Sequence, residues 1–174
     1  TNNSMFFGSA QSGTSADNIL GLEVVTSKGR IIKTGSDSII NGKAFYRNNG
    51  PDITGLFLND GGIMGIKTKI TLMLEQIPSS EKFISVSFKS SENLINAIKD
   101  IGRSYLTSEC IGIIPSSIGS PENSHDPSLH IVIEGWTDHI AEKKIDAVKE
   151  ILSSFDKNNY LDPVIPKLFR EKLF

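Results

Sequence analysis

The fold is organised around residues 50–68, which read GPDITGLFLNDGGIMGIKT. Pro51 suits the first turn of a helix, because its fixed φ and its missing N–H cost nothing there. A glycine-dense loop over 59–62 then permits positive φ and lets a ligand approach the bare backbone. The strand that follows alternates with period two, which predicts one face formed by Ile66, Thr68, Ile70, Leu72 and Leu74. A helix, a glycine loop and a strand in this order can form a backbone cradle for a ligand, although most glycine loops are only turns.

The length and composition exclude several classes of protein. A chain of 174 residues can form one domain or two small ones. Its net charge of −2 gives no indication of nucleic acid or of an anionic membrane as a partner. No apolar run approaches the roughly 20 residues of a membrane span. Cys110 is the single cysteine, so no internal disulfide can form. We therefore expect a cytoplasmic protein. Peripheral attachment to a membrane stays an open alternative.

The first 49 residues are expected to form loops around one hairpin. Residues 1–20 are small and polar, so they form either a flexible terminus or a second part of the ligand cradle. The β-branched runs 22–26 and 30–33 flank a Ser-Lys-Gly turn and predict a β-hairpin. Residues 35–49 are polar and predict a loop. Because the opening is typical of mid-domain sequence, we expect the chain to be a fragment.

The character of the sequence changes after Pro-Ser-Ser at 78–80, which predicts a linker between domains 1–77 and 78–174. Periodicity from Phe83 onward predicts a strand, a helix, two strands and a second helix. This β-α-β-β-α order predicts an α+β fold of the ferredoxin-like, split βαβ type. Residues 166–174 are expected to form a short amphipathic helix or part of an element whose partner is absent.

Both predicted helices of this second half have candidate caps. Ser90 or Ser91 can cap the first helix, and Thr137 or Asp138 can cap the second. The second helix is expected to bury one face, formed by Ala141, Ile145, Val148, Leu152 and Phe155.

No catalytic or metal-binding side chain stands out. His125, His130 and His139 lack the spacing of a zinc site, so we predict no metal and expect exposed or partly buried structural histidines. Cys110 begins an apolar strand and is expected to be an inert core thiol. Trp136 is expected to pack at the edge of its domain.

Two segments of the first half resemble motifs of FAD-linked oxidases. Residues 14–25 and 28–31 read TSADNILGLEVV and KGRI, similar to the DNVLGLEVVLADGRV of that family. Residues 47–57 and 62–68 resemble its GPDLTGLF and EGTLGIITKATLRL segments, and residues 2–4 resemble its NNSSG loop without the last Ser-Gly. The chain therefore resembles flavoproteins of the vanillyl-alcohol oxidase and p-cresol methylhydroxylase type. The nearest branch is the group of the glycolate oxidase GlcD subunit and D-lactate dehydrogenase.

The resemblance implies a cofactor and the residues that meet it. Residues 1–77 would form the second subdomain of a PCMH-type FAD-binding domain, and 78–174 part of the cap domain. The positions that match FAD-contacting motifs are Asn3, Ser4, Gly8, Gly13, Thr14, Asp17, Asn18, Gly62, Gly65 and Ile66. Glycine loops fit this role because a pyrophosphate needs converging N–H donors without side chains in the way. Ile66 would contact FAD through its main chain with its side chain in the core, and Asp17 has a turn or cap as its alternative role.

The implied reaction is the oxidation of a 2-hydroxy acid, such as glycolate or D-lactate, by hydride transfer to the flavin. An electron acceptor and a second copy of the chain are the further expected partners. The chain departs from the family pattern at Gly61, where the family has glutamate, and at Asp60, where it has serine. The upstream pyrophosphate loop and the downstream GNLH motif of the family have no counterpart in these residues, so the catalytic residues are unknown. The alternative is a non-catalytic ferredoxin-like module that binds another subunit.

Overall fold

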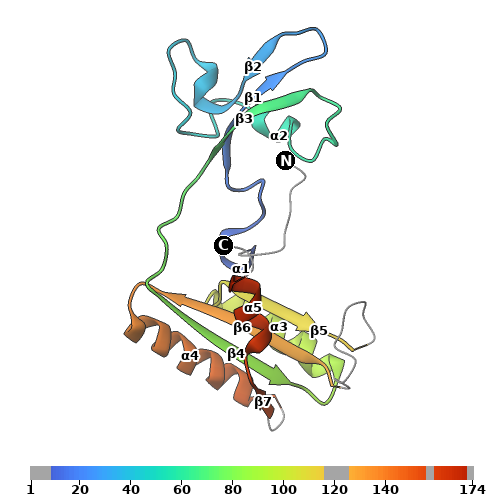
Figure 1. Cartoon of the computed structure of the whole chain (residues 1–174), viewed down its shortest axis with the longest axis vertical. Helices are drawn as coiled ribbons and strands as arrows, with labels where there is room; N and C mark the ends of the chain where they lie inside the picture. Colours follow the sequence, from blue (N-terminus) through green and yellow to red (C-terminus); the bar gives the residue numbers. More distant parts are fainter. Residues whose placement is uncertain (1–8, 116–125, 156–158, 172–174) are drawn as a thin grey trace. The chain divides into compact units, whose positions relative to one another are not determined.

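The computed structural model describes residues 9–115, 126–155 and 159–171. The chain divides into two compact units, residues 1–76 (unit 1) and residues 77–174 (unit 2) (Figure 1). Each unit combines helices with its own antiparallel sheet, which confirms the predicted α+β class. The assignment of these parts to an FAD-binding domain and a cap domain stays a prediction.

Unit 1 is built on a three-stranded sheet. Its elements are α1 (Ser9–Ser12), β1 (Ile19–Val25), β2 (Ile31–Lys33), the 3-10 helix η1 (Gly35–Ser38), α2 (Ile53–Leu56) and β3 (Ile66–Leu72). The sheet has the order β2-β1-β3, and both pairs are antiparallel. The predicted hairpin is confirmed, since Val25 of β1 pairs with Ile31 of β2. The helix expected from Pro51 is a single turn that begins at Ile53.

The strand β3 does not bury the face that its alternation predicts. The side chain of Ile66 is 71% exposed, so the expectation that it joins the core is wrong. At Ile66 the cause is a β-bulge: Glu23 pairs with Lys69, but the next residue, Val24, pairs with Lys67, so one residue of β3 is left over. A one-residue shift exchanges the two faces of a strand. Lys67 therefore shares a face with the buried Val24, and Ile66 turns to solvent.

The core of unit 1 is small. Its buried members come from the first strand and from the end of α2: Ile19, Leu22, Val24 and Phe57. Ile32 and Leu58 pack against them and are partly buried. A three-stranded sheet with so few buried side chains gains little stability from apolar burial.

Unit 2 has the ferredoxin-like order of elements. These are β4 (Ser80–Ser87), α3 (Ser91–Ser104), β5 (Glu109–Ile113), β6 (Ser128–Gly135), α4 (Asp138–Ser153), β7 (Asn159–Leu161) and α5 (Val164–Glu171). The sheet order is β5-β6-β4-β7, with every neighbouring pair antiparallel. The predicted β-α-β-β-α series is confirmed, and β7, which the sequence did not predict, adds the fourth strand at the edge of the sheet.

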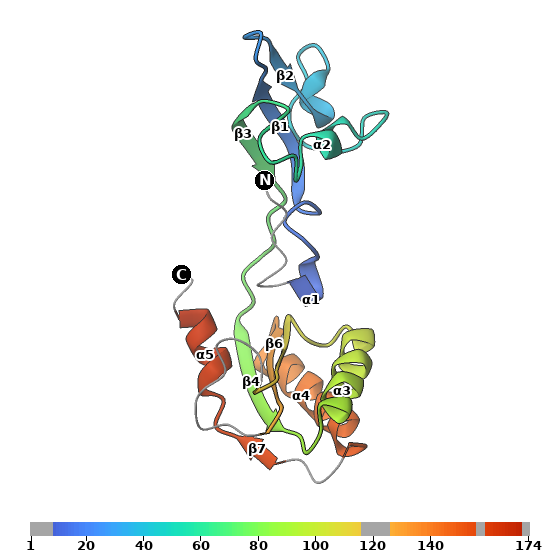
Figure 2. The ribbon, with the colours of Figure 1, turned by 90° about the vertical axis from the view of Figure 1, so that its right-hand side faces the viewer.

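Two helices cover one face of this sheet. Helices α3 and α4 pack on one side, and α5 lies against the other (Figure 2). The core between α3, α4 and the sheet contains Ile84, Val86, Phe88, Leu94, Ala97, Ile101, Leu129, Ile131, Ile133, Val148 and Leu152. Alternate residues of β4 and β6 supply most of its strand side, as the period-two pattern predicts.

Capping residues set where the helices of unit 2 begin. The Ser90 hydroxyl accepts a hydrogen bond from the Asn93 amide at 3.2 Å. The Thr137 hydroxyl accepts one from the Ile140 amide at 3.3 Å. Each of these bonds satisfies an amide of the first turn that has no partner within the helix. The structure thus selects Ser90 and Thr137 from the two pairs of candidates.

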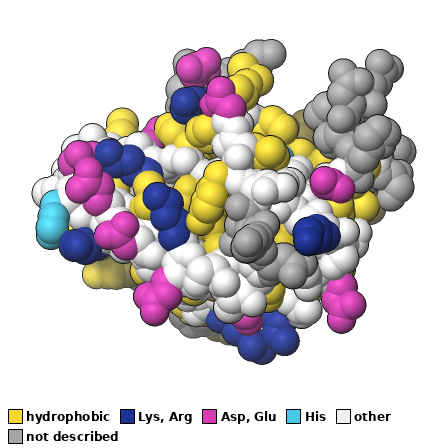
Figure 3. Space-filling model, turned by 90° about the horizontal axis from the view of Figure 1, so that it is seen from below, with side chains coloured by type: hydrophobic (Ala, Val, Ile, Leu, Met, Phe, Trp, Pro, Cys, Tyr) yellow, Lys and Arg dark blue, Asp and Glu magenta, His cyan; other side chains and the backbone are white. Residues whose placement is uncertain are grey.

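The surface of unit 2 carries both signs of charge. Basic and acidic side chains are interspersed with apolar ones over the face that Figure 3 shows. A mixed surface of this kind agrees with the net charge of −2. In the described parts of the chain, no helix has the length and apolar character needed to span a membrane.

Candidate functional site

The first candidate loop precedes β1 and is held together by its own side chains. The Thr14 amide and hydroxyl both donate to Oδ2 of Asp17 at 2.7 Å. The Asn18 side chain donates to the carbonyls of Ser12 at 2.9 Å and Thr14 at 3.1 Å. The bonds from Thr14 hold the pKa of the Asp17 carboxyl below its ordinary value. Asp17 therefore has the turn-forming role that was its alternative, and its contact with a cofactor stays a prediction.

Glycine is required at one position of this loop. Gly13 has φ of 71°, and a Cβ there would lie 2.7 Å from the Asp17 carboxylate. The structure thus brings together four of the predicted site residues: Gly13, Thr14, Asp17 and Asn18. The predicted residues Asn3, Ser4 and Gly8 lie outside the described residues.

An arginine that the site prediction missed connects the first loop to residues 50–68. Arg47 pairs with Asp52 at 2.8 Å and also donates to the carbonyl of Ala16. Asp52 in turn caps α2 by accepting the Gly55 amide at 3.0 Å. The Arg47 guanidinium lowers the pKa of the Asp52 carboxyl. The signal in the sequence was an arginine and an aspartate five residues apart around a Gly-Pro turn.

The second candidate loop, residues 59–65, folds around a carboxylate. Asp60 accepts the amides of Gly62 and Met64, each at 3.1 Å. Its carboxylate also forms an ion pair with Lys67, and the two side chains are only 7% and 8% exposed. The hydrogen bond from Lys67 lowers the pKa of Asp60 to about 2. Neither Asp60 nor Lys67 was among the predicted site residues.

The glycines of the second loop have two different roles. Gly65 has φ of 139°, and a Cβ there would lie 2.6 Å from the Val25 carbonyl, so only glycine lets the loop join β1 this closely. Gly61 and Gly62 also have positive φ, but a Cβ at either would meet no atom within 4 Å. Their outer side is therefore open to an approaching molecule.

The two loops lie at opposite ends of one strand pair. The Met73 amide donates to the Asn18 carbonyl at 2.8 Å at the end of β3, whereas Ile66 at its start pairs with Val25. Six residue steps along β1 correspond to about 20 Å. Those predicted site residues that the structure describes thus form two groups, and only a long ligand can contact both.

A buried hydroxyl pair ties α2 to the sheet. The Thr54 hydroxyl donates to the Thr34 hydroxyl at 2.8 Å, and Thr34 accepts the Leu22 amide at 2.9 Å. Both threonine side chains are fully buried. Buried polar groups of this kind stabilise a fold only when they are paired. This chain of bonds therefore positions α2 on β1.

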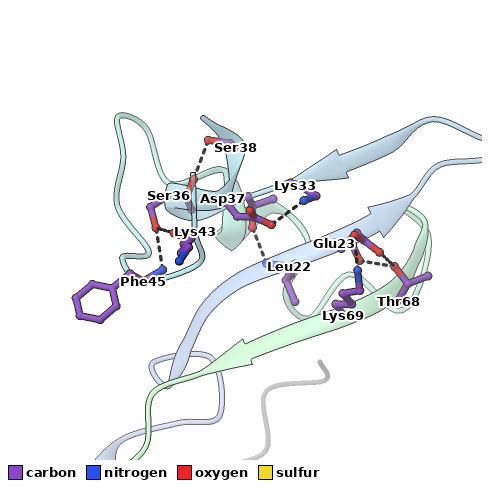
Figure 4. A network of polar contacts seen from close by, with 12 residues as sticks. Leu22, Glu23, Lys33, Ser36, Asp37, Ser38, Lys43, Phe45, Thr68 and Lys69 are labelled. Carbon is purple, nitrogen blue, oxygen red and sulfur yellow. Dashed lines mark hydrogen bonds and ion pairs between the residues drawn. The ribbon is translucent and has the colours of Figure 1, made fainter. Parts of the chain in front are cut away.

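Further polar contacts hold the segment after β2 and the edge of β3 (Figure 4). The Ser36 hydroxyl donates to the Lys43 carbonyl at 2.6 Å and accepts the amides of Phe45 and Tyr46 at 2.8 and 2.9 Å. On β1, the Glu23 carboxylate accepts the Thr68 hydroxyl at 2.8 Å, which lowers its pKa. Both candidate loops thus belong to a unit held largely by polar contacts.

Unit 2 contains a buried histidine. The Nδ1 atom of His130 lies 2.9 Å from the Ser85 hydroxyl, and its Nε2 atom lies 3.1 Å from the Ser128 hydroxyl. His130 is 2% exposed, so the expectation of an exposed or partly buried residue is wrong for it. Burial lowers its pKa to about 4. His130 lies on β6 between its register partners Ser85 of β4 and Ile111 of β5, a setting that its position on a predicted strand could not show.

The other residues of unit 2 that the sequence singled out are two histidines, Cys110 and Trp136. His139 is exposed, and His125 lies outside the described residues. Where the structure is described, no three His, Cys, Asp or Glu side chains form a group that could hold a metal ion. Burial raises the pKa of the Cys110 thiol to about 11, in agreement with an inert thiol. Trp136 is largely exposed rather than packed.

Curated proteins similar in sequence are oxidoreductases. The chain is 32% identical over 89 residues to the glycolate oxidase subunit GlcD of Bacillus subtilis (strain 168), which is 51% of this chain and 18% of that protein. It is 38% identical over 66 residues to the mitochondrial D-lactate dehydrogenase [cytochrome] of Arabidopsis thaliana, covering 38% of this chain and 11% of that protein. The chain thus spans less than a fifth of the length of these relatives. No family model matches the chain.

Solved structures with the same fold cover most of the chain. A p-cresol methylhydroxylase with bound substrate matches 90% of this chain and 37% of its own, with a TM-score of 0.70 and 16% identity. An alkyldihydroxyacetonephosphate synthase matches 95% of this chain and 32% of its own, with a TM-score of 0.69 and 17% identity. The sequence relatives and the shared fold agree with the motifs around both loops. The chain is thus similar in sequence to a glycolate oxidase subunit and a D-lactate dehydrogenase, and it has the fold of the PCMH-type FAD-binding proteins.

Proposed function

We propose that the protein binds FAD and oxidises a small 2-hydroxy acid, such as glycolate or D-lactate. The observation that carries this proposal is the sequence similarity to a glycolate oxidase subunit and to a D-lactate dehydrogenase. Bound flavin would supply the hydride acceptor for the α-carbon of the substrate. The residues of unit 1 would supply binding and orientation, and an electron acceptor would reoxidise the flavin.

The geometry of unit 1 is compatible with a long dinucleotide. The first loop and the second loop lie about 20 Å apart along β1, a separation that suits an extended ligand. The outer side of Gly61 and Gly62 is open, so a ligand can approach the backbone there. At the other end, the polar groups of Thr14 and Asn18 border the start of β1. These features support contact with FAD along the strand pair.

The release of flavin tests the cofactor. Protein purified with its natural flanking sequence should release FAD on denaturation, measured by absorbance and chromatography. A protein that releases no flavin, and that cannot be reconstituted with FAD, would refute the proposal. The 174-residue chain alone should bind FAD weakly or not at all, because its relatives contain much more polypeptide; micromolar binding by this chain would contradict that expectation.

The substrate is tested separately from the cofactor. Glycolate, D-lactate and L-lactate should be added without oxygen while the flavin absorbance is followed. Bleaching by glycolate or D-lactate supports the 2-hydroxy acid. If the flavin is present but none of these acids bleaches it, the cofactor proposal stands and the substrate proposal fails.

The complete sheet and separate core of unit 2 favour a second candidate function. In this alternative, unit 2 is a non-catalytic module that binds another subunit, and the chain carries no flavin chemistry. Mixing the chain with a separately expressed upstream subdomain distinguishes the two. A yellow, active complex supports the enzyme, whereas a complex that forms without flavin supports the module.

A further inference from the structure

The second loop turns its backbone amides inward. Successive backbone N–H groups in a turn form a concavity that binds anions. Here the amides of Gly62 and Met64 both donate to the carboxylate of Asp60, and the ammonium of Lys67 pairs with the same group. A carboxylate of the chain itself therefore occupies the place where a phosphate would bind.

This internal anion is difficult to displace. Asp60 and Lys67 are almost fully enclosed, at 7% and 8% exposure. Separating an enclosed ion pair leaves a charge without compensation, which is strongly unfavourable. A phosphate that approached the amides would also meet the negative charge of Asp60 at short range. Both effects oppose phosphate binding at this loop.

The outer surface of the loop has a different character. Ile63 is 89% exposed, Met64 is 45% exposed, and Ile66, beyond Gly65, is 71% exposed. Between them and Asp60, the backbone at Gly61 and Gly62 is open. This surface offers apolar contact and bare backbone, which suit an uncharged ring better than a phosphate.

We infer that Asp60 and Lys67 determine specificity at this loop by closing it to phosphate, so that a dinucleotide meets the loop with an uncharged part. The identity of that ligand rests on the proposed function. The exclusion of phosphate is a property of this chain alone and can be measured without flavin. The pyrophosphate of the dinucleotide would then have to be bound by other residues, although the glycines of the second loop suggest that they bind it.

Amide NMR on the full 174-residue chain tests this inference, with inorganic phosphate as the probe. In the wild type, millimolar phosphate should leave the Gly62 and Met64 resonances unchanged. In Asp60→Ala the same resonances should move and saturate, with phosphate bound at least about tenfold more tightly than in the wild type. The matched variant Asp60→Ala/Lys67→Met should lose most of this binding, because the cation is gone.

The resonances of β1 and β3 serve as the control for folding. If they change in Asp60→Ala, then Asp60→Asn replaces it, because asparagine keeps the size of the side chain but carries no charge against phosphate and has one acceptor oxygen in place of the two that hold the Gly62 and Met64 amides. Saturable shifts in the wild type, or none in the folded variant, would overturn the inference. A protein that lacks flavin but shows the expected phosphate response would refute the proposed function and leave this inference intact.

Discussion

Unit 1 and unit 2 are both built on antiparallel sheets, but they are stabilised differently. Unit 2 packs two helices on one face of its sheet and buries the large apolar cluster described above. Unit 1 buries a cluster of only a few side chains, while many large apolar residues of its loops and of β3 stay exposed. The fold of unit 1 is held by the buried hydroxyls of Thr34 and Thr54 and by the ion pair between Asp60 and Lys67.

The two units therefore require different contacts to be stable. An amphipathic sheet covered by helices can be stable by itself, whereas a small sheet with exposed apolar faces requires further contacts. A second copy of the chain, already expected as a partner from the sequence, is one partner that we propose for this exposed apolar surface. Hydrogen exchange should show the amides of β4 and β6 protected more strongly than those of β1 and β3.

Removing an apolar side chain from the core of unit 2 should have the largest effect. Ile131→Ala deletes a fully buried side chain and should lower the free energy of unfolding by about 2–5 kcal/mol. The matched control is Ile40→Ala in unit 1, where the side chain is almost fully exposed and the change should stay within about 0.5 kcal/mol. Urea unfolding measures both. Equal effects at the two positions would contradict the comparison.

Acid should act on unit 2 through His130. Its pKa falls from 6.5 to about 4 on folding, so the unfolded state binds more protons in this range. The free energy of unfolding of unit 2 therefore keeps its full value above pH 6.5. It falls as the pH falls toward 4, by up to roughly 3 kcal/mol. Urea unfolding of unit 2 at several pH values measures it. His130→Gln should flatten this dependence, and His139→Gln, at an exposed histidine, should keep it; the same slope in both variants would refute the assignment.

The hydroxyl pair of unit 1 should have a smaller effect. Thr34→Val leaves the buried Leu22 amide without its acceptor and should cost about 1–3 kcal/mol, whereas Thr54→Val removes one hydrogen bond and should cost about 1 kcal/mol. Exchange of the β1 amides measures the loss within unit 1. If Thr54→Val were the more costly change, Thr34 would not be the residue on which the buried Leu22 amide depends, as the structure shows.

The helix caps should have the smallest effect. Ser90→Ala and Thr137→Ala should each lower the stability of unit 2 by about 1 kcal/mol, because an amide of the first turn loses its acceptor. Ser91→Ala is the matched control for Ser90, since Ser91 lies within the helix. Thermal unfolding compares the three variants, and a loss in Ser91→Ala as large as that in Ser90→Ala would contradict the capping assignment.

The candidate site was predictable only in part. The motifs around Asp17 and Gly62 located both loops, because glycines with positive φ and turn-forming side chains are local features. Arg47, Asp60 and Lys67 were missed as site residues, because their roles depend on partners brought together by folding. Whether the loops contact FAD stays a prediction, with the 2-hydroxy acid and the electron acceptor.

The sequence by itself determined the order of elements, the hairpin of β1 and β2 and the amphipathic helices of unit 2, because hydrophobic periodicity, turn residues and caps act within a few residues. Only the tertiary structure decided that a bulge turns Ile66 to solvent, that His130 is enclosed and that β7 joins the sheet. Strand register and burial depend on contacts between residues far apart in the chain. The partner of the amides of the second loop was likewise decided by the tertiary structure, because the Asp60 carboxylate that they bind is held in place by Lys67 of β3.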